Sequence, residues 1–504
     1  MARIAFCQDV MVEYMGFMTL SAVLKQAGHT VEVFFDPQTN ADRFVEEVRA
    51  FRPDVVGFSI LTPSVPWATA MALRMKQLPG VVTVFGNVHA MLNPEETIAW
   101  PGVDMVCTGE GEFTLLELAA ALDAGQPYDE IVGLWVKTAD GVRRNPNREQ
   151  LVDMDAMPMP DRQMYNKYLF FRKSPYLRVM AGRGCPFRCS FCSNTTMMDH
   201  YGGVKTYVRK KQPQAAVSEI RAMIDAHPGR VKHIFFIDEV FWVKNEWLRT
   251  FLPLYKAQIG LPFTANFRFG GITEDDIRLL AEAGASGLSL STESGDEEQR
   301  RGLLNKPATN AQILRIAGWM HKYGINFGSS AFFGLPGDTV DDHMQRLAFF
   351  RAVNPKYLWT TFFQPYPKLF LTQHPDIAPH MPQNEAFNVT LHHDMYLNLP
   401  DRERLVRLKK VYYLMMRFPW LEKPLRRLID FRIPLLFDVL FLMHFTYYIF
   451  LAEKISFFQY LVHLKTFAIN PVLRRKLPLQ QSGAPYTPPP AQRIPVVQQA
   501  DADH

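Results

Sequence analysis

Cysteine is scarce in this chain of 504 residues, which contains only five. So few cysteines exclude a disulfide framework and indicate a reducing compartment, which we expect to be the cytoplasm. The chain also lacks a large excess of either sign of charge, because it has 55 Lys and Arg residues and 50 Asp and Glu residues. The net charge of +5 gives no reason to expect nucleic acid as a partner. The first residues run directly into a predicted strand, so we expect no secretory signal peptide.

Three of the five cysteines lie close together, at Cys185, Cys189 and Cys192. Three thiolates on a short loop can bind three irons of a 4Fe–4S cube and leave the fourth iron without a protein ligand. A zinc knuckle and a buried structural trio are the alternatives. Structural zinc usually takes four protein ligands, and the nearest further candidate, His200, lies outside the window. The pattern therefore favours a cluster with one open iron.

The spacing C-x3-C-x2-C, with Phe191 before the last cysteine, resembles the signature of the radical S-adenosylmethionine (SAM) enzymes. This resemblance implies that SAM chelates the open iron and that one electron cleaves it to a 5′-deoxyadenosyl radical. It also implies a reducing donor such as flavodoxin or ferredoxin and a small-molecule substrate. We expect Phe191 to shield the cluster and to border the adenine of SAM.

Residues 1–130 alternate predicted strands and helices, from a strand at Arg3–Cys7 to a helix at Phe113–Leu122. The nearly all-apolar segment Asp54–Leu61 is typical of a strand buried on both faces. The alternation predicts an α/β domain with a doubly wound, Rossmann-like parallel sheet. Ligands in such a sheet lie beyond the carboxyl ends of the strands. No G-x-G-x-x-G follows the first strand, which argues against a dinucleotide.

Small and polar residues follow the strands of this first domain. The candidate cofactor contacts are Ser59, Leu61, Gly86, His89, Gly109 and Glu110. These loops resemble the cobalamin-binding domain that precedes the barrel in one branch of the radical SAM family. A domain that binds nothing, or a nucleotide, is the alternative, and a lone histidine is more often a hydrogen-bonding residue than a ligand. Met11 and Tyr14 replace the His and Gly of the axial-ligand motif, so we expect no imidazole on cobalt from this loop.

Residues 131–170 predict a hairpin, turning at Asp140-Gly141, and a proline-broken linker. Residues 171–390 then show six strand–helix steps, which resemble the partial (β/α)6 barrel of radical SAM enzymes. The cysteine loop follows the first of these strands, Leu177–Ala181, and barrel folds place their chemistry at this end of the strands.

Polar residues at the later strand ends are the candidate SAM contacts. Arg268 ends the third strand, while Glu293 and Ser294 end the fourth. Carboxylates suit the ammonium and the ribose diol of SAM, and an arginine suits its carboxylate. The resemblance implies that Glu293 lies near SAM and that the turn Gly334–Asp338 helps to hold adenine. A solvated ion pair at the rim of the barrel is the alternative for Arg268 and Glu293.

Residues 391–480 predict a helical region rich in apolar and basic residues, and residues 481–504 predict a disordered tail. The stretch 433–451 approaches the length of ~20 residues that spans a bilayer. It contains Asp438 and His444, which are costly in hydrocarbon. A buried helical cap and a peripheral membrane contact are therefore favoured over a transmembrane span.

Taken together, the resemblance implies a cobalamin-dependent radical SAM enzyme that transfers a methyl group to an unactivated carbon of a small substrate. The apolar carboxyl-terminal region suggests that this substrate is lipophilic, such as a lipid, an isoprenoid or a tetrapyrrole-like molecule. The radical would remove a substrate hydrogen, and the substrate would then take the methyl group from cobalamin. A radical SAM oxidative cyclase and an iron–sulfur electron carrier or sensor are the alternatives. A transfer RNA methylthiotransferase usually needs three more cysteines, and only Cys7 and Cys107 remain.

Overall fold

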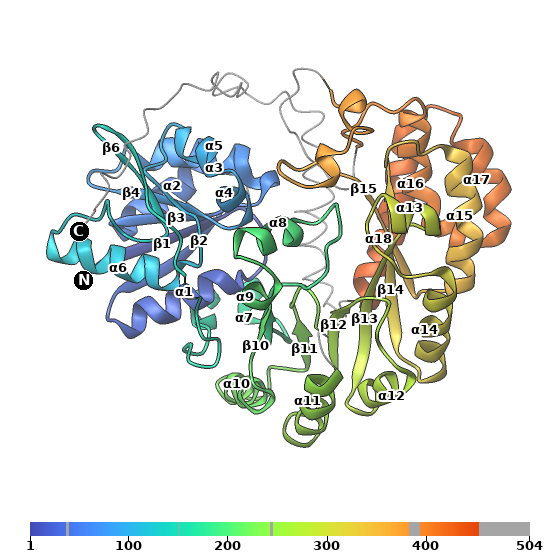
Figure 1. Ribbon diagram of the computed structural model, residues 1–504, viewed down its shortest axis with the longest axis horizontal. Coiled ribbons are helices and arrows are strands. Elements are labelled where there is room, and N and C mark those ends of the chain that lie inside the picture. Colours follow the sequence, from blue (N-terminus) through green and yellow to red (C-terminus); the bar gives the residue numbers. More distant parts are fainter. Residues whose placement is uncertain (37–39, 150, 242–244, 383–393, 453–504) are drawn as a thin grey trace. The chain divides into compact units, whose positions relative to one another are not determined.

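The computed structural model describes residues 1–36, 40–149, 151–241, 245–382 and 394–452. It divides into two compact units, of which the first spans Met1–Lys173 and the second begins at Ser174. Each unit is built around its own sheet (Figure 1).

The first unit contains a seven-stranded sheet in the order β2-β1-β3-β4-β5-β6-β7. Its parallel strands are β1 (Arg3–Gln8), β2 (Thr30–Phe35), β3 (Val55–Ser59), β4 (Val82–Gly86) and β5 (Met105–Cys107). Its helices are α1 (Met15–Gln26), α2 (Ala41–Phe51), α3 (Val65–Met75), α4 (Val88–Leu92), α5 (Pro94–Ala99), α6 (Gly111–Ala124) and α7 (Leu169–Arg172). Helices cover both faces of the sheet, with α1 beside α6 and α2 beside α3 (Figure 1). The predicted doubly wound α/β fold is confirmed.

Apolar packing across the central strands explains why this sheet forms. Phe58 of β3 stacks on Phe85 of β4 at 4.8 Å between ring centroids. Gly57 makes room for a third ring, because a Cβ at this position would lie 2.8 Å from Phe6 of β1. Cys7 and Cys107 are buried in β1 and β5 as small core residues.

The hairpin of β6 (Leu134–Thr138) and β7 (Gly141–Arg144) continues the same sheet, because β6 pairs antiparallel with β5. The segment after it also packs on the first unit. The hydroxyl of Tyr165 donates to Gln8 Oε1 at 2.6 Å, and Arg162 pairs with the buried Glu13 at 2.7 Å. Hairpin and connector are thus parts of the first unit.

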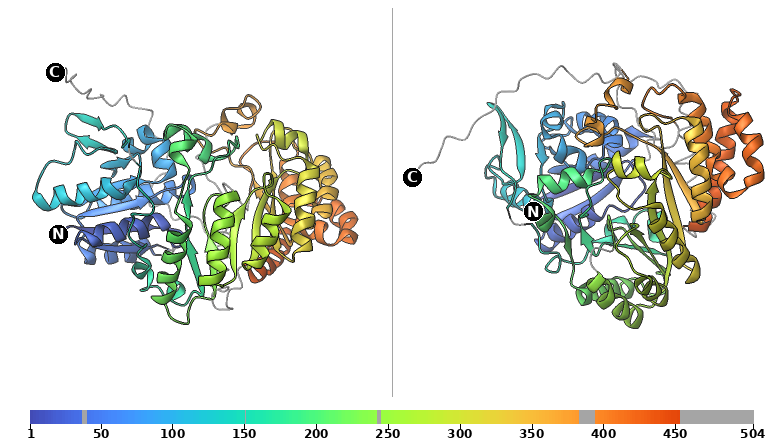
Figure 2. Two further views of the ribbon diagram at one scale, coloured as in Figure 1. Left: turned by 60° about the horizontal axis from the view of Figure 1, so that its bottom comes forward. Right: turned by 45° about the vertical axis from the view of Figure 1, so that its right-hand side comes forward.

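The second unit contains a six-stranded parallel sheet in the order β15-β14-β13-β12-β11-β8. Its strands are β8 (Tyr176–Val179), β11 (His233–Phe236), β12 (Phe263–Phe267), β13 (Ala285–Glu293), β14 (Asn326–Phe333) and β15 (Tyr357–Phe362). The connecting helices are α10 (Pro213–Asp225), α11 (Asn245–Gln258), α12 (Glu274–Glu282), α14 (Asn310–Lys322) and α15 (Val340–Val353). They lie along the outside of the sheet (Figure 2, left). The six predicted strand–helix steps are confirmed.

Three of these helices begin with the same local signal. Thr273, Thr309 and Thr339 each form a capping box with the side chain three residues further on. Such a box satisfies two backbone N–H groups that a helix start leaves without partners. The sequence therefore fixes the points at which the chain leaves the strand-end loops.

The carboxyl-terminal region is helical, with α16 (Arg402–Arg417), α17 (Glu422–Leu428) and α18 (Pro434–Ala452). Helix α16 packs on β15 and α15, and the Tyr412 hydroxyl donates to the backbone oxygen of His343 at 2.7 Å. Much of α16 is buried in a core that it shares with β14 and β15. Within the described residues, no helix has the length and apolar character that crossing a bilayer requires.

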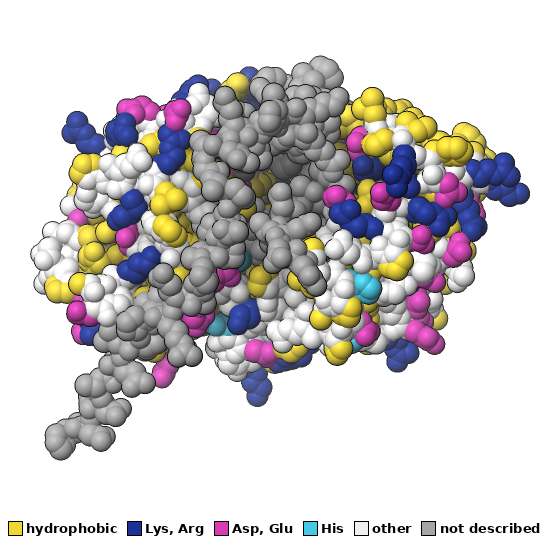
Figure 3. Space-filling model, turned by 90° about the horizontal axis from the view of Figure 1, so that it is seen from above, with side chains coloured by type: hydrophobic (Ala, Val, Ile, Leu, Met, Phe, Trp, Pro, Cys, Tyr) yellow, Lys and Arg dark blue, Asp and Glu magenta, His cyan; other side chains and the backbone are white. Residues whose placement is uncertain are grey.

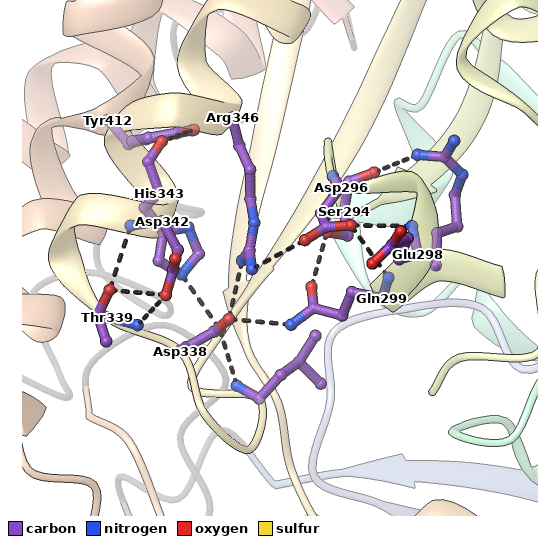
Figure 4. Close-up of polar contacts among 12 residues, drawn as sticks. Ser294, Asp296, Glu298, Gln299, Asp338, Thr339, Asp342, His343, Arg346 and Tyr412 are labelled. Carbon is purple, nitrogen blue, oxygen red and sulfur yellow. Dashed lines mark hydrogen bonds and ion pairs between the residues drawn. The ribbon is translucent and has the colours of Figure 1, made fainter. Parts of the chain in front are cut away.

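Asp338 is the hub of a buried polar network at the turn after β14 (Figure 4). It accepts hydrogen bonds from His343 at 3.1 Å, from Arg346 at 2.8 Å and from Gln299 of α13 (Glu297–Gly302) at 3.0 Å. Burial alone would raise the pKa of Asp338, but His343 and Arg346 hold it well below its usual range. The carboxylate therefore joins the loops after β13 and β14 to α15.

We predict that Asp338→Asn lowers the free energy of unfolding by about 3 kcal/mol, because it leaves buried cationic groups without their counter-charge. Because the folded pKa is depressed, the contribution of Asp338 is present at neutral pH and is lost as the pH falls through that folded value. Urea unfolding of the full chain at several pH values measures both effects. The control Asp341→Asn removes an exposed ion pair with Arg426 and should cost no more than about 0.5 kcal/mol. Equal losses in the two variants would contradict the role of the hub.

Candidate functional site

The three clustered cysteines lie on the loop between β9 (Gly182–Arg183) and α8 (Ser193–His200), and all are half-buried. The loop begins at Gly184, which has a φ of +82°. A Cβ on Gly184 would lie 2.5 Å from the backbone oxygen of Tyr207, at the end of α9 (Val204–Tyr207). Pairing of β9 with β10 (Arg209–Lys210) brings these two segments together. Only glycine fits this conformation and this approach.

The far side of the loop is fixed by backbone contacts to two other loops. The Ser190 N–H donates to the oxygen of Leu304 at 3.1 Å, and the Leu371 N–H donates to the oxygen of Ser190 at 2.7 Å. Phe191 packs edge-on against Phe332 of β14 at 4.9 Å. The cysteine loop is thereby held against the loops that follow β13 and β15.

A short polar chain reaches one of the sulfurs. The Tyr207 hydroxyl donates to Asn194 Oδ1 at 2.5 Å, and Asn194 Nδ2 donates to Cys192 Sγ at 3.5 Å. Hydrogen bonds to sulfur stabilise the thiolate form and tune the potential of a cluster. Burial raises the pKa of the Cys185 thiol to about 12 and also raises that of Cys192. These buried sulfurs need cationic partners to be thiolates, and the irons of a cluster supply such charge.

The described residues contain no group of three His, Cys, Asp or Glu side chains close enough to share one metal ion. A cube places different demands on its ligands, because each thiolate binds a different iron and the sulfurs stand further apart. Cys185, Cys189 and Cys192 remain the predicted ligands of the 4Fe–4S cluster.

Glu293 ends β13 in a strained conformation, with a φ of +68° and a shift in the register between β13 and β14. Its buried carboxylate accepts hydrogen bonds from Lys306 Nζ at 3.2 Å and from the Ser330 hydroxyl at 2.9 Å. Positive φ is uncommon for a residue with a side chain, and such strain concentrates at functional sites. The end of β13 thus directs into the interior a carboxylate whose charge is balanced by Lys306. The neighbouring Ser294 instead donates to Gln299 at 2.7 Å and belongs to the Asp338 network.

Arg268, immediately after β12, is buried and stacks on Phe187 of the cysteine loop at 3.8 Å. Its Nη1 is buried and has no hydrogen-bond partner among the residues that the structure describes. A buried guanidinium with an unsatisfied N–H is costly unless an anion or acceptor binds there. This position beside the loop is compatible with a contact to the carboxylate of SAM, which stays a prediction.

Gln364, two residues beyond β15, is a site candidate that the sequence reasoning missed. Only 5% of its surface is exposed, and neither the oxygen nor the nitrogen of its amide has a hydrogen-bond partner among the described residues. An amide buried in this way offers one donor edge and one acceptor edge to a ligand. In the sequence analysis, Gln364 is the final residue of the last predicted strand. Its polar side chain at a strand end is the signal that could have identified it as a site residue.

The predicted cobalamin contacts lie at the carboxyl edge of the first unit's sheet. Ser59 ends β3 and Gly86 ends β4, and the Asn87 side chain donates to the Ser59 hydroxyl at 3.0 Å. Leu61 is exposed beyond β3. Gly109 follows β5, and the Glu110 carboxylate accepts from the Val152 N–H at 2.9 Å, which joins the β5 loop to the connector.

His89 lies in α4, buried against the ring of Trp100 at 5.6 Å. Its Nδ1 is 3.1 Å from the Thr62 hydroxyl, and its Nε2 has no hydrogen-bond partner within the described part of the chain. Burial lowers the pKa of His89 to about 4, so the imidazole is neutral at pH 7. The hydroxyl of Tyr14, from the loop after β1, is another buried polar atom that no described residue satisfies. These two atoms, one in α4 and one in the loop after β1, fit a bound ligand.

Two family models match this chain in succession. The B12 binding domain matches residues 9–119, and the Radical SAM superfamily matches residues 179–350. The chain belongs to the cobalamin-binding radical SAM family. Its cofactors are therefore a 4Fe–4S cluster, SAM and cobalamin.

Relatives within this family carry out more than one reaction. The chain is 27% identical over 363 residues to the anaerobic magnesium-protoporphyrin IX monomethyl ester cyclase of Rubrivivax gelatinosus, covering 69% of this chain and 63% of that protein. It is 28% identical over 241 residues to the hopanoid C-3 methylase of Methylococcus capsulatus, covering 47% and 44%. The match thus spans less than two thirds of either protein.

A solved structure shares the fold of this family member. The radical SAM methyltransferase TsrM of Kitasatospora setae, with tryptophan and a SAM analogue bound, matches with a TM-score of 0.60 at 20% identity. The match covers 73% of this chain and 75% of TsrM. At this identity the likeness concerns the fold alone.

We predict that Gly184→Ala abolishes most of the iron uptake during anaerobic reconstitution. The positive φ alone costs about 1–2 kcal/mol with a side chain, and the contact with Tyr207 forces the loop to move. Iron per chain and the absorbance of the cluster measure the effect. Gly318→Ala in α14 is the matched control, because a Cβ there meets no atom within 4 Å. Retention of full iron content by Gly184→Ala would contradict this account of the loop.

Proposed function

We propose that this protein is a cobalamin-dependent radical SAM methyltransferase that acts on an unactivated carbon of a small lipophilic substrate. One observation carries the proposal. The C-x3-C-x2-C loop stands at the carboxyl ends of a six-stranded parallel sheet, in a chain that also has a B12 binding domain. Carboxyl ends of parallel strands are where such folds bind substrates and cofactors.

Each residue of the second unit's site has a proposed task. Cys185, Cys189 and Cys192 bind three irons and leave one iron open for SAM. Arg268 pairs its unsatisfied N–H with the SAM carboxylate, since guanidinium and carboxylate form strong charge-assisted hydrogen bonds. Glu293, paired with Lys306 at 3.2 Å, accepts hydrogen bonds from the ammonium or the ribose hydroxyls of SAM. Phe191 covers the cluster on the side of β14.

The loops at the carboxyl edge of the first unit's sheet are proposed to hold cobalamin through Ser59, Leu61, Gly86, His89, Gly109 and Glu110. Their backbone groups and the unsatisfied His89 Nε2 provide hydrogen-bonding positions. Bound cobalamin supplies a transferable methyl group, and the cluster supplies one electron. The protein supplies position and shielding from water. Since the neutral His89 does not change charge near pH 7, this contact is insensitive to pH there.

Two relatives support a lipophilic substrate, because hopanoids and porphyrin esters are both lipophilic molecules. The amide of Gln364 is proposed to contact a polar group of the ligand inside the barrel. An oxidative cyclase is the second candidate, favoured by the longer match to the magnesium-protoporphyrin cyclase. We place the reaction in the cytoplasm, with flavodoxin or ferredoxin as the reductant.

Methyl transfer and cyclisation are separated by following the methyl group of SAM. The reconstituted holoenzyme is incubated anaerobically with dithionite, SAM bearing a deuterated methyl group, and a solvent extract of cell lipids. We expect deuterated lipid products together with 5′-deoxyadenosine, detected by mass spectrometry. Deoxyadenosine with unlabelled new products would instead establish the cyclase type.

The control variants test whether the cysteine loop is responsible. Replacing Cys185, Cys189 or Cys192 by alanine should lower deoxyadenosine formation by at least about 100-fold. The reason is that the cluster then loses one of the three thiolates that hold it. Cys107→Ala changes a buried cysteine outside the loop and should leave the turnover within about two-fold, since a buried cysteine behaves as a small apolar residue. Unchanged deoxyadenosine formation in all three loop variants would refute the proposal.

A further inference from the structure

Helix α18 has one face that packs on the barrel, and this face contains its acidic residue and its histidine, Asp438 and His444. Asp438 pairs with Lys410 of α16 at 2.5 Å. His444 is buried between the Tyr357 hydroxyl, at 3.2 Å, and the backbone oxygen of Lys410, at 3.0 Å. The two residues that argue against hydrocarbon contact are therefore turned inward and satisfied.

The opposite face of α18 is an exposed apolar stripe. Leu435, Val439, Met443 and Tyr447 are 67%, 44%, 64% and 47% exposed, respectively. They follow one another at intervals of four residues, so they line one side of the helix. We call these four residues the α18 stripe. A row of exposed large apolar side chains on one helix marks an interaction surface.

The amino-terminal end of the stripe continues into the segment before the helix. Phe431 and Ile433 are exposed there, and the highly exposed Arg432 lies between them. Aromatic and aliphatic side chains beside a basic one are typical of elements that lie in a membrane interface.

The other end of the stripe borders a basic hollow of about 220 Å³. Among the described residues, it is lined by Tyr447 of the stripe, by Lys356 and Arg417, and by His321, Asn326 and Asn354, and none of these lining residues is Asp or Glu. Asn326 begins β14 and Lys356 immediately precedes β15, so the hollow lies at the amino-terminal edge of the sheet. This edge is opposite to the one that carries the cysteine loop.

We propose that the α18 stripe and the basic hollow seat this protein on an anionic phospholipid membrane. The stripe enters the interface between headgroups and acyl chains, and Lys356 and Arg417 take a headgroup phosphate in the hollow. A helix of 19 residues lying in the membrane plane extends over about 28 Å. On the face seen from above, Figure 3 shows hydrophobic and basic side chains next to each other on the side where α17 lies in Figure 1.

Charge and shape favour lipid over another protein as the occupant. Anionic lipids attract basic groups that lie close to the surface, and apolar side chains add affinity by leaving water. The carboxyl-terminal end of the stripe lies beside Lys356 and Arg417, and none of the described residues that line the hollow is acidic. At the amino-terminal end, Arg432 is paired with Glu403 at 3.1 Å. The proposal goes beyond the reaction and does not depend on which one the enzyme performs.

Flotation of the full-length reconstituted protein with vesicles tests the proposal. Vesicles of phosphatidylcholine with phosphatidylglycerol should bind the protein, pure phosphatidylcholine should bind it far less, and added salt should release it. The double variant Leu435→Ser/Met443→Ser should reduce binding by about ten-fold or more, given the apolar area removed. In Lys356→Gln and Arg417→Gln, binding should fall by about five-fold for each charge.

Matched variants elsewhere in the second unit provide the control. Leu314→Ser changes an exposed apolar residue of α14, and Lys256→Gln removes an exposed cation from α11. Both should bind vesicles as the native protein does, and every variant is compared by thermal unfolding and iron content to show that it is folded.

Three outcomes would overturn the proposal. The first is that the native protein does not bind anionic vesicles, or that the stripe variants bind them as well as the native protein does. The second is a dimer in solution that the stripe variant abolishes without any vesicle binding, which would make a second copy the occupant. The third is vesicle binding that appears only after residues 453–504 are removed, which would mean that the chain itself occupies the stripe.

Discussion

All six strands of the second unit run in one direction, and this constraint brings the site together. Residues that follow different strands, far apart in the sequence, reach the same edge of the sheet. The cysteine loop follows β8 and β9, Arg268 follows β12, Glu293 ends β13, Asp338 follows β14, and Gln364 follows β15. If one strand were reversed, the side chain that follows it would lie at the opposite edge and could not cooperate with the others.

Buried charge at this edge is compensated in two separate ways. Glu293 is paired with Lys306 and accepts a hydrogen bond from Ser330, with a strained backbone. Asp338 is surrounded by His343, Arg346, Gln299 and the backbone N–H of Leu335, and it serves to hold the loops. The second carboxylate therefore has a structural role, while the first stays the predicted SAM contact. Arg268 and Gln364 at the same edge of the sheet each have buried polar atoms without a hydrogen-bond partner among the described residues.

The order of strands and helices could be predicted because alternating apolar runs are local signals. The strand-end positions of Arg268 and Glu293 followed from the same pattern. Lys306 could not be found in this way, since its pairing with Glu293 depends on how the loop after β13 folds back. The unsatisfied amide of Gln364 depends on packing around β15, which no sequence pattern encodes.

Helix α18 shows the same limit. Its sequence is apolar all round, and the composition of residues 433–451 alone left a cap and a membrane element equally open. Placement of α16 decides which side of α18 is inside, because Lys410 pairs with Asp438 and its backbone oxygen lies beside His444. The stripe on the other side becomes visible only when that contact is known.

The central claim is that three sulfurs hold a cluster whose fourth iron binds SAM. Electron paramagnetic resonance of the anaerobic, dithionite-reduced protein, recorded before and after addition of SAM, tests it most directly. A 4Fe–4S signal that changes shape when SAM is added is the predicted result, because the amino and carboxylate groups of SAM then bind iron. A cluster signal that SAM leaves unaltered, or no cluster signal at all, would contradict the account.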